Sequence, residues 1–147
     1  MQNSYSLLER GDEAEVLPLC EELGLGFTPF SPLAGGWLAG RYRRGVAAPA
    51  GSRMTMRPGP YEHLRRDEVW DALEGLEARA ADTGVDMATL AFAWLLSDPR
   101  VTAVIVGPRR PEHLEPAVRA LDLRLSPSER AELASLFPWA FRDMSGV

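Results

Sequence analysis

The chain of 147 residues contains no lysine, so all 16 of its basic residues are arginines. A mechanism that needs a lysine ammonium group therefore cannot be carried out by this chain alone. Cysteine occurs once, at Cys20, which excludes an intramolecular disulfide and a cysteine-based metal site. His63 and His113 are the two histidines, and no spacing in the sequence predicts a metal site or a Ser-His-Asp triad.

Long apolar runs are also absent. No stretch approaches the ~18 apolar residues that cross a membrane, and the first residues do not resemble a signal peptide. The formal net charge of −5 argues against nucleic acid or an anionic membrane as a partner. Hydrophobic residues make up 46% of the chain and charged residues 25%, as in ordinary globular proteins. We therefore expect a cytoplasmic protein in which residues 1–147 form a single domain.

The stretch from Phe27 to Tyr42 is the most informative part of the sequence. Residues 25–30 are mostly apolar and predict a buried strand, which ends at Ser31-Pro32 in a loop with three glycines. Glycine allows a ligand to approach the backbone closely, and Arg41 follows as a cation suited to phosphate. From these residues two interpretations remain open, an anion-binding loop and a plain turn after a core strand.

Helical signals fill most of the remaining chain. We expect helices over residues 12–23, from residue 67 to Gly84, over residues 88–97, after Pro111, and from residue 126 to about residue 137. The expected N-caps are Asp12, Asp86 and Ser126, the last in a capping box with Glu129. The apolar stripe of the helix after Pro111 consists of Leu114, Val118 and Leu121. Residues 138–147 are expected to form a loosely docked tail.

The order of elements predicts an α/β fold. Residues 101–106 form a β-branched run that predicts a second strand covered on both faces, and alternating strands and helices favour a parallel sheet. Two strands do not make a stable sheet, so the chain supplies part of a larger sheet or is a fragment of one. Residues 43–66 are rich in arginine and form a long loop, with one helical turn near residues 61–66. This loop is either solvated or covers a bound anion.

Ligand sites in parallel α/β folds form where the strands end. Residues 107–110 contain a glycine and two arginines directly before a helix N-terminus, which favours an anion. Together with the loop after Phe30, they predict a large phosphorylated cofactor, the alternative being that Arg109 and Arg110 are merely solvated. His113 is a candidate ligand contact by its position, and Phe30 can stack on a flat ring.

Three motifs in sequence order resemble the aldo-keto reductases, NADP(H)-dependent oxidoreductases built on a TIM barrel. Residues 2–10 resemble the end of barrel strand six, residues 30–42 the cofactor loop after strand seven, and residues 105–115 the strand-eight loop with the helix that holds the adenosine 2′-phosphate. The resemblance covers essentially the whole chain but only the second half of the family's fold. It implies the C-terminal half of a (β/α)₈ TIM barrel, an incomplete barrel.

The resemblance also implies an NADP(H)-binding role for twelve residues. Gln2 matches the contact to the nicotinamide carboxamide, and Phe30 matches the aromatic that stacks on the nicotinamide ring. The pyrophosphate loop is matched by Ser31, Pro32, Leu33, Ala34 and Gly35. The basic and phosphate-binding positions are matched by Arg41, Arg53, Gly107, Arg109 and His113. Pro116 and Ala117 depart from the acidic residue and asparagine usual near the adenine, which leaves the preference between NADP and NAD open.

The family's catalytic aspartate, tyrosine, lysine and histidine lie in its first half, and Tyr5, Tyr42 and Tyr61 match none of them. We expect the chain to position the cofactor and to be inactive alone, so that a small carbonyl substrate belongs only to a complete enzyme. Three interpretations compete: a truncated enzyme of this family, a non-catalytic NADP-binding or interaction module that pairs with a complementary half barrel or with itself, and a decayed gene product without a stable fold.

Overall fold

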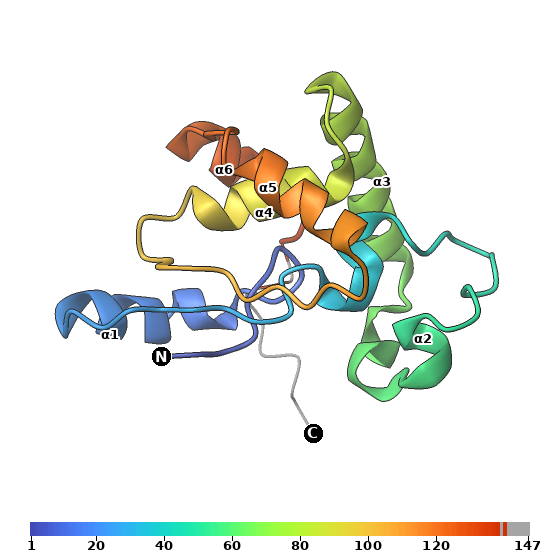
Figure 1. Cartoon of the computed structure of the whole chain (residues 1–147), viewed down its shortest axis with the longest axis horizontal. Helices are drawn as coiled ribbons and strands as arrows, with labels where there is room; N and C mark the ends of the chain where they lie inside the picture. The colour runs from blue at the N-terminus through green and yellow to red at the C-terminus, as the bar shows by residue number, and fades with distance from the viewer. Residues whose placement is uncertain (139, 141–147) are drawn as a thin grey trace.

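The computed structural model describes residues 1–138 and 140, and within them the chain is built of helices and extended loops (Figure 1). The α-helices are α1 (Val16–Glu22), α2 (Arg53–Met56), α3 (Asp67–Asp82), α4 (Met87–Leu96), α5 (Glu115–Ala120) and α6 (Pro127–Ser135). Short 3₁₀ helices are η1 (Gly11–Glu13), η2 (Ala34–Ala39), η3 (Gly59–Leu64) and η4 (Pro111–Leu114). None of the helices in the described part is long and apolar enough to span a bilayer.

Three extended segments lie side by side at the centre of the fold. Isolated parallel bridges join Ser4 to Phe30 and Phe27 to Val101, and the N–H of Thr102 donates to the carbonyl of Phe27 at 2.9 Å. Residues 1–4 and 101–105 therefore flank residues 27–30 on opposite sides. In Figure 1 residues 101–105 run between α1 and α4, while the segment at the N-terminus runs below α1. All three run in the same direction, so their ends meet at one edge.

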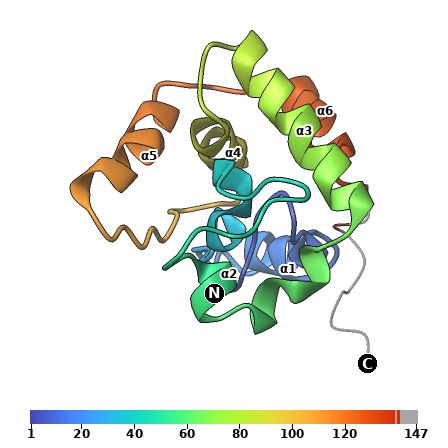
Figure 2. The same cartoon turned by 90° about the vertical axis from the view of Figure 1, so that its right-hand side faces the viewer.

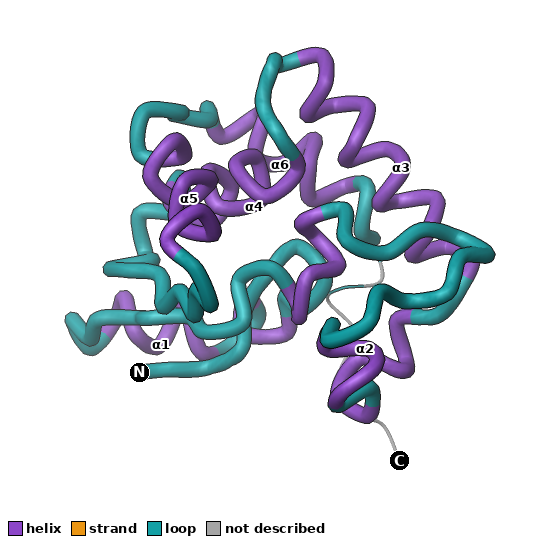
Figure 3. The backbone as a smooth tube through the Cα atoms, turned by 45° about the vertical axis from the view of Figure 1, so that its right-hand side comes forward, coloured by secondary structure: helices purple, strands orange, loops and turns teal. Residues whose placement is uncertain are grey.

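The predicted strands 25–30 and 101–106 are wrong as regular strands, because the described residues contain only bridges and no strand is drawn in Figure 3. Pro29 has no N–H to donate, which interrupts the ladder in the middle segment. The expected cover on both faces is also missing from the third segment, where Ile105 is 41% exposed. A parallel sheet needs both faces buried, and here one face is open.

Two helix predictions near the N-terminus need correction. The first helix begins at Val16 rather than at residue 12, because Pro18 lacks an N–H and lies in the first turn. Asp12 is not its N-cap, since the Asp12 carboxylate accepts from Nδ2 of Asn3 at 3.2 Å instead. The predicted end is confirmed, with Gly24 in the left-handed region at φ +64° just beyond the helix. The loop 43–66 contains α2, which the sequence did not predict, as well as the expected turn, now seen as η3.

The helices with strong local signals are confirmed. The buried face of α3 consists of Val69, Ala72, Leu73, Leu76 and Ala80. Asp86 caps α4 by accepting from the Thr89 N–H at 2.7 Å, and nearly all of α4 is buried. The capping box of α6 is complete. Figure 2 shows α3 and α6 side by side, and Arg79 on α3 donates to Glu132 on α6 at 3.0 Å.

The face that α5 buries is the opposite of the predicted one. Leu114, Val118 and Leu121 are 37%, 59% and 59% exposed. Ala120 is buried instead and packs with Phe92 and Ala93 of α4. Small alanine side chains let the two helices approach closely, and this leaves the larger apolar side chains facing outward. Most of the predicted tail lies outside the described residues, although Ala140 is buried and its carbonyl accepts from the Arg10 N–H at 2.8 Å.

Arg130 on α6 links both ends of the chain to the core. Its Nη2 donates to the Tyr5 hydroxyl at 2.9 Å and to Oδ2 of Asp98 at 2.7 Å, and its guanidinium lies 4.4 Å from the ring centroid of Trp94. The Tyr5 hydroxyl in turn donates to Glu13 at 2.7 Å. Burial alone would raise the pKa of Asp98, but hydrogen bonds from Arg100 and the nearby arginine charges outweigh it and hold that pKa below its usual value.

Replacing Arg130 by methionine is expected to lower the free energy of unfolding by about 2 kcal/mol, because Tyr5 and the buried Asp98 each lose a charge-assisted partner. Urea denaturation measures the loss. Arg124→Met is the matched control, since Arg124 is exposed, and it should change stability by less than about 0.5 kcal/mol. Equal losses in the two variants would show that the Arg130 contacts do not stabilise the fold.

Candidate functional site

The loop from Ser31 to Gly36 has an unusual backbone. Ser31 and Ala34 have φ of +58° and +46° and are the non-glycine residues with positive φ in the described chain. Gly35 and Gly36 follow with φ of +66° and +103°. Successive left-handed residues can turn backbone N–H groups toward one side, an arrangement that favours an anion. In this loop the N–H groups of Ala34 and Gly36 donate to the carbonyls of Ser31 and Leu33 at 2.9 Å. Left-handed non-glycine residues are also typical of functional sites, where the surrounding structure holds them in place.

Two tyrosines hold this loop. The Tyr42 hydroxyl donates to the Gly35 carbonyl at 2.9 Å and accepts from the Met54 N–H at 3.4 Å. The Tyr61 hydroxyl lies 3.3 Å from Oγ of Ser31, and its ring covers Gly35 so closely that a Cβ there would be 2.7 Å from the ring carbons. No pattern in the sequence indicates either contact with the loop, because each forms only when residues 42–61 fold back over it.

Gln2 and Phe30 lie on the paired first and middle segments, in which the residue bridged to Phe30 is Ser4. The Phe30 N–H donates to the Asn3 carbonyl at 2.9 Å, and the Thr28 N–H donates to the Met1 carbonyl at 2.9 Å, so Gln2 is flanked by two contacts with the middle segment. Gln2 is exposed, and the Phe30 side chain is 41% exposed although it is a large apolar group. An exposed aromatic ring beside a polar amide can stack on a flat ligand ring.

The remaining predicted loop residues pack inward. Pro32 and Ala34 are buried and Leu33 is half-buried, so only the backbone of this part of the loop is available to a ligand.

The arginines near the loop divide into two groups. Arg43 is paired with Glu77 through both terminal nitrogens at 2.5 and 2.7 Å. Arg44 contacts three acidic residues on α3, namely Asp67, Asp71 and Glu74. Arg41 and Arg53 are exposed and make no ion pair with the residues that the structure describes. Arg41 and Arg53, two of the three arginines predicted to bind the cofactor, are therefore not neutralised by a described carboxylate.

The third predicted segment joins the site through Arg109. Its Nη1 donates to the Gly51 carbonyl at 2.9 Å, which ties residues 107–110 to the loop that carries Arg53. The Arg109 N–H also donates to Nδ1 of His113 at 3.3 Å. Gly107, Arg109 and His113 are all exposed. The structure thus connects residues 107–110 to the loop that carries Arg53, and residues 1–4 to the segment that ends at Phe30.

A loop with left-handed backbone, an exposed aromatic ring and exposed arginines therefore lie near the ends of the parallel segments. The sequence matches the Aldo/keto reductase family over residues 1–137. The chain belongs to this family, whose fold is the (β/α)₈ barrel.

Curated relatives agree with the family. The chain is 38% identical over 137 residues to an uncharacterized oxidoreductase, YrpG, of Bacillus subtilis (strain 168), a match that covers 93% of this chain and 40% of that protein. It is 38% identical over 138 residues to L-glyceraldehyde 3-phosphate reductase of Escherichia coli (strain K12), covering 90% and 39%. It is 33% identical over 129 residues to NADH-specific methylglyoxal reductase of the same strain, covering 88% and 39%. The chain therefore spans about two fifths of the length of these relatives.

Substituting Gly35 by alanine is expected to destabilise the chain more than the same change at Gly45. Both glycines have positive φ, at +66° and +70°, so alanine costs about 1–2 kcal/mol of backbone strain at each. Only at Gly35 does the new Cβ meet another group, the Tyr61 ring, which should add about 1 kcal/mol in urea denaturation. The added cost should vanish in a Tyr61→Ala background. If Gly35→Ala and Gly45→Ala have equal effects, Tyr61 does not hold the loop.

Proposed function

We propose that this chain carries the cofactor-binding half of an NADP(H)-dependent aldo-keto reductase that reduces a carbonyl group to an alcohol. The observation that carries the proposal is the loop from Ser31 to Gly36, whose left-handed backbone favours an anion and which follows the exposed aromatic ring of Phe30. Reduced nicotinamide would supply the hydride in this reaction. The residues of this chain would bind and orient the nicotinamide cofactor.

The residues present fit such a cofactor. Phe30 offers a ring face for the nicotinamide, and Gln2 offers an amide for its carboxamide. The backbone of residues 31–35 would hold the pyrophosphate, with Arg41 supplying a cation that no carboxylate in the described chain already neutralises. The second cationic region consists of Arg53, Gly107, Arg109 and His113, which suits the adenosine 2′-phosphate. A 2′-phosphate distinguishes NADP from NAD, and we propose NADP(H) on that ground.

The proton for the carbonyl oxygen would have to come from outside this chain. The sequence has no lysine to lower the pKa of a tyrosine acid. Burial raises the pKa of Tyr5, which makes it a poorer acid, and its hydroxyl is already bonded to Glu13. The hydroxyls of Tyr42 and Tyr61 both contact the loop. We therefore propose that this chain positions the cofactor for the reduction of a small carbonyl substrate. The catalytic groups for that reaction would belong to the other half of the barrel.

A second candidate function is that of a non-catalytic module that pairs with a complementary half barrel or with another copy of itself. The exposed apolar residues favour it: Leu25, Phe30, Ile105, Leu114, Val118 and Leu121 are 37–59% exposed. Residues 101–106 present an open edge and an uncovered face, and such edges favour pairing with another chain.

Nucleotide titration by isothermal calorimetry tests the cofactor assignment. Arg109→Gln is expected to raise the Kd for NADPH about tenfold and to leave the Kd for NADH unchanged, because only NADPH carries the 2′-phosphate. Arg41→Gln should weaken both nucleotides, since both have a pyrophosphate. Arg57→Gln is the control and should weaken neither. Absence of binding by the unmodified chain, or equal binding of both nucleotides that Arg109→Gln leaves unchanged, would contradict the assignment.

The purified chain is expected to show no aldehyde-dependent oxidation of NADPH. A chain without lysine and with Tyr5 buried has no tyrosine acid whose pKa a neighbouring lysine lowers, as protonation of the carbonyl oxygen requires here. The measurement follows NADPH absorbance with 4-nitrobenzaldehyde, with a sample lacking aldehyde as the control. Consumption of NADPH that depends on the aldehyde would refute the claim that the proton donor lies outside this chain.

A further inference from the structure

We propose that the chain has a second ligand site, a cavity that binds a small planar aromatic carboxylate. The cavity has a volume of about 360 Å³, within the range of about 300–1,000 Å³ typical of small-molecule sites. It lies between the loop after η2, the end of η3 and the first turn of α3. The residues that carry the argument are Trp37, Tyr42, Val46, Met54, Arg65 and Trp70.

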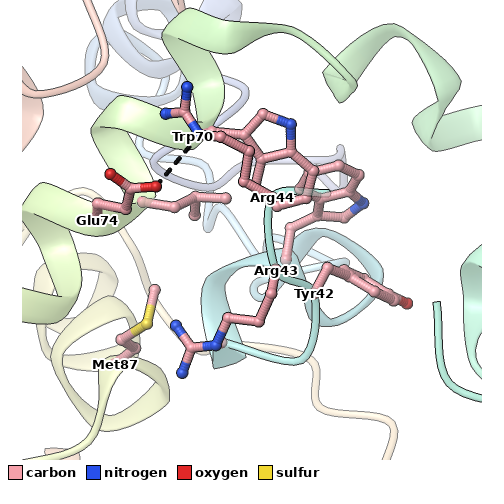
Figure 4. Close-up of a pocket in the computed structure, with 9 residues that line it drawn as sticks. Tyr42, Arg43, Arg44, Trp70, Glu74 and Met87 are labelled. Atoms are coloured by element: carbon pink, nitrogen blue, oxygen red, sulfur yellow. Dashed lines mark hydrogen bonds and ion pairs between the residues drawn. The ribbon is translucent and has the colours of Figure 1, made fainter. Parts of the chain in front are cut away.

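Aromatic rings form the floor of this cavity. The Trp37 ring centroid is 4.8 Å from that of Trp70 and 5.2 Å from that of Tyr42. Met54 adds a buried thioether side chain. Clustered ring faces with an adjacent sulfur favour a flat aromatic ligand, which can stack on or meet the edge of an indole. Figure 4 shows Tyr42 and Trp70 around the smaller cavity of about 30 Å³ that adjoins this one.

The floor is held in place before any ligand arrives. Trp37 is 1% exposed, and the Tyr42 hydroxyl is fixed between the Gly35 carbonyl and the Met54 N–H. Arg43 and Arg44 hold the adjoining loop against α3 through their ion pairs with acidic residues. A site that is already formed loses little conformational freedom on binding, which favours a small rigid ligand.

The charges around the cavity select an anion. Its lining contains Arg43 and Arg65 and no acidic residue. Arg43 is neutralised by Glu77, but Arg65 is bonded only through Nε, at 3.4 Å from Glu62, and its side chain is 51% exposed. The two terminal nitrogens of Arg65 have no hydrogen bond to the described residues, so they can receive a carboxylate in the paired geometry that guanidinium favours. An aromatic cage alone would also suit a quaternary ammonium ion, which this lining disfavours.

This cavity is separate from the proposed cofactor site. None of the twelve residues assigned to the cofactor lines it. The two sites share a boundary at Tyr42, whose ring faces the cavity side while its hydroxyl supports the loop at Gly35. The second site therefore does not depend on whether the chain binds a nucleotide, and it can be tested without one.

The test is a calorimetric titration of the full chain with 2-naphthoate and, for comparison, with 2-naphthylmethanol, which has the same rings and no charge. The unmodified chain should bind naphthoate more tightly than the alcohol. Arg65→Gln should raise the Kd for naphthoate about tenfold and leave that for the alcohol unchanged. Val46→Glu places a carboxylate at the mouth and should weaken naphthoate at least as much. Val46 is 67% exposed, so the fold should tolerate this change.

Arg57→Gln is the matched control, because Arg57 is an exposed arginine of the same loop that does not line the cavity. It should leave naphthoate binding unchanged. The proposal is overturned if the unmodified chain shows no saturable binding of naphthoate, if the alcohol binds equally well, or if Arg65→Gln and Val46→Glu bind naphthoate as the unmodified chain does.

Discussion

The contacts of Arg130 decide how the two ends of the described chain come together. Its guanidinium joins Tyr5 to Asp98, and the Trp94 indole N–H donates to the Arg130 carbonyl at 3.0 Å. With Tyr5 fixed in the core, residues 1–4 run beside residues 27–30. That pairing places Gln2 between the contact of Met1 with Thr28 and the contact of Asn3 with Phe30, so the position of this predicted cofactor residue depends on a contact made far from it.

The second constraint is the division of the arginines, because an acidic chain must leave some cations unpaired to bind a phosphorylated ligand. Arg43 and Arg44 are used to fasten the loop to α3, where their carboxylate partners recur along one face. Arg41 and Arg53, close by in sequence, have no such partners among the described residues. A fixed loop with available cations is what a preorganised anion site requires, since little must be ordered on binding.

Local signals predicted the helices well and the extended segments poorly. Asp86 and Ser126 were assigned correctly because a cap involves groups only three residues apart. The prediction of Asp12 as an N-cap was wrong, because the Asp12 carboxylate accepts a hydrogen bond from the side-chain amide of Asn3. The run at residues 101–106 has strand composition, but a parallel strand forms only where neighbours cover it. The apolar stripe near α5 has the period of a helix, but it faces outward instead of toward the core. The reason is that Ala120 rather than a leucine packs against α4.

The sequence by itself determined the family, the positions of the three motifs that resemble the family's cofactor-binding segments, and the absence of lysine, because each is a property of residue type and order. The tertiary structure alone decided which arginines remain available, that Tyr61 covers Gly35, and that Trp37, Tyr42 and Trp70 enclose a second cavity. These outcomes depend on contacts between residues far apart in the sequence, such as Trp37 with Trp70, 33 positions apart, and Arg43 with Glu77, 34 positions apart. No periodicity encodes them, since they arise only when separate elements pack on one another.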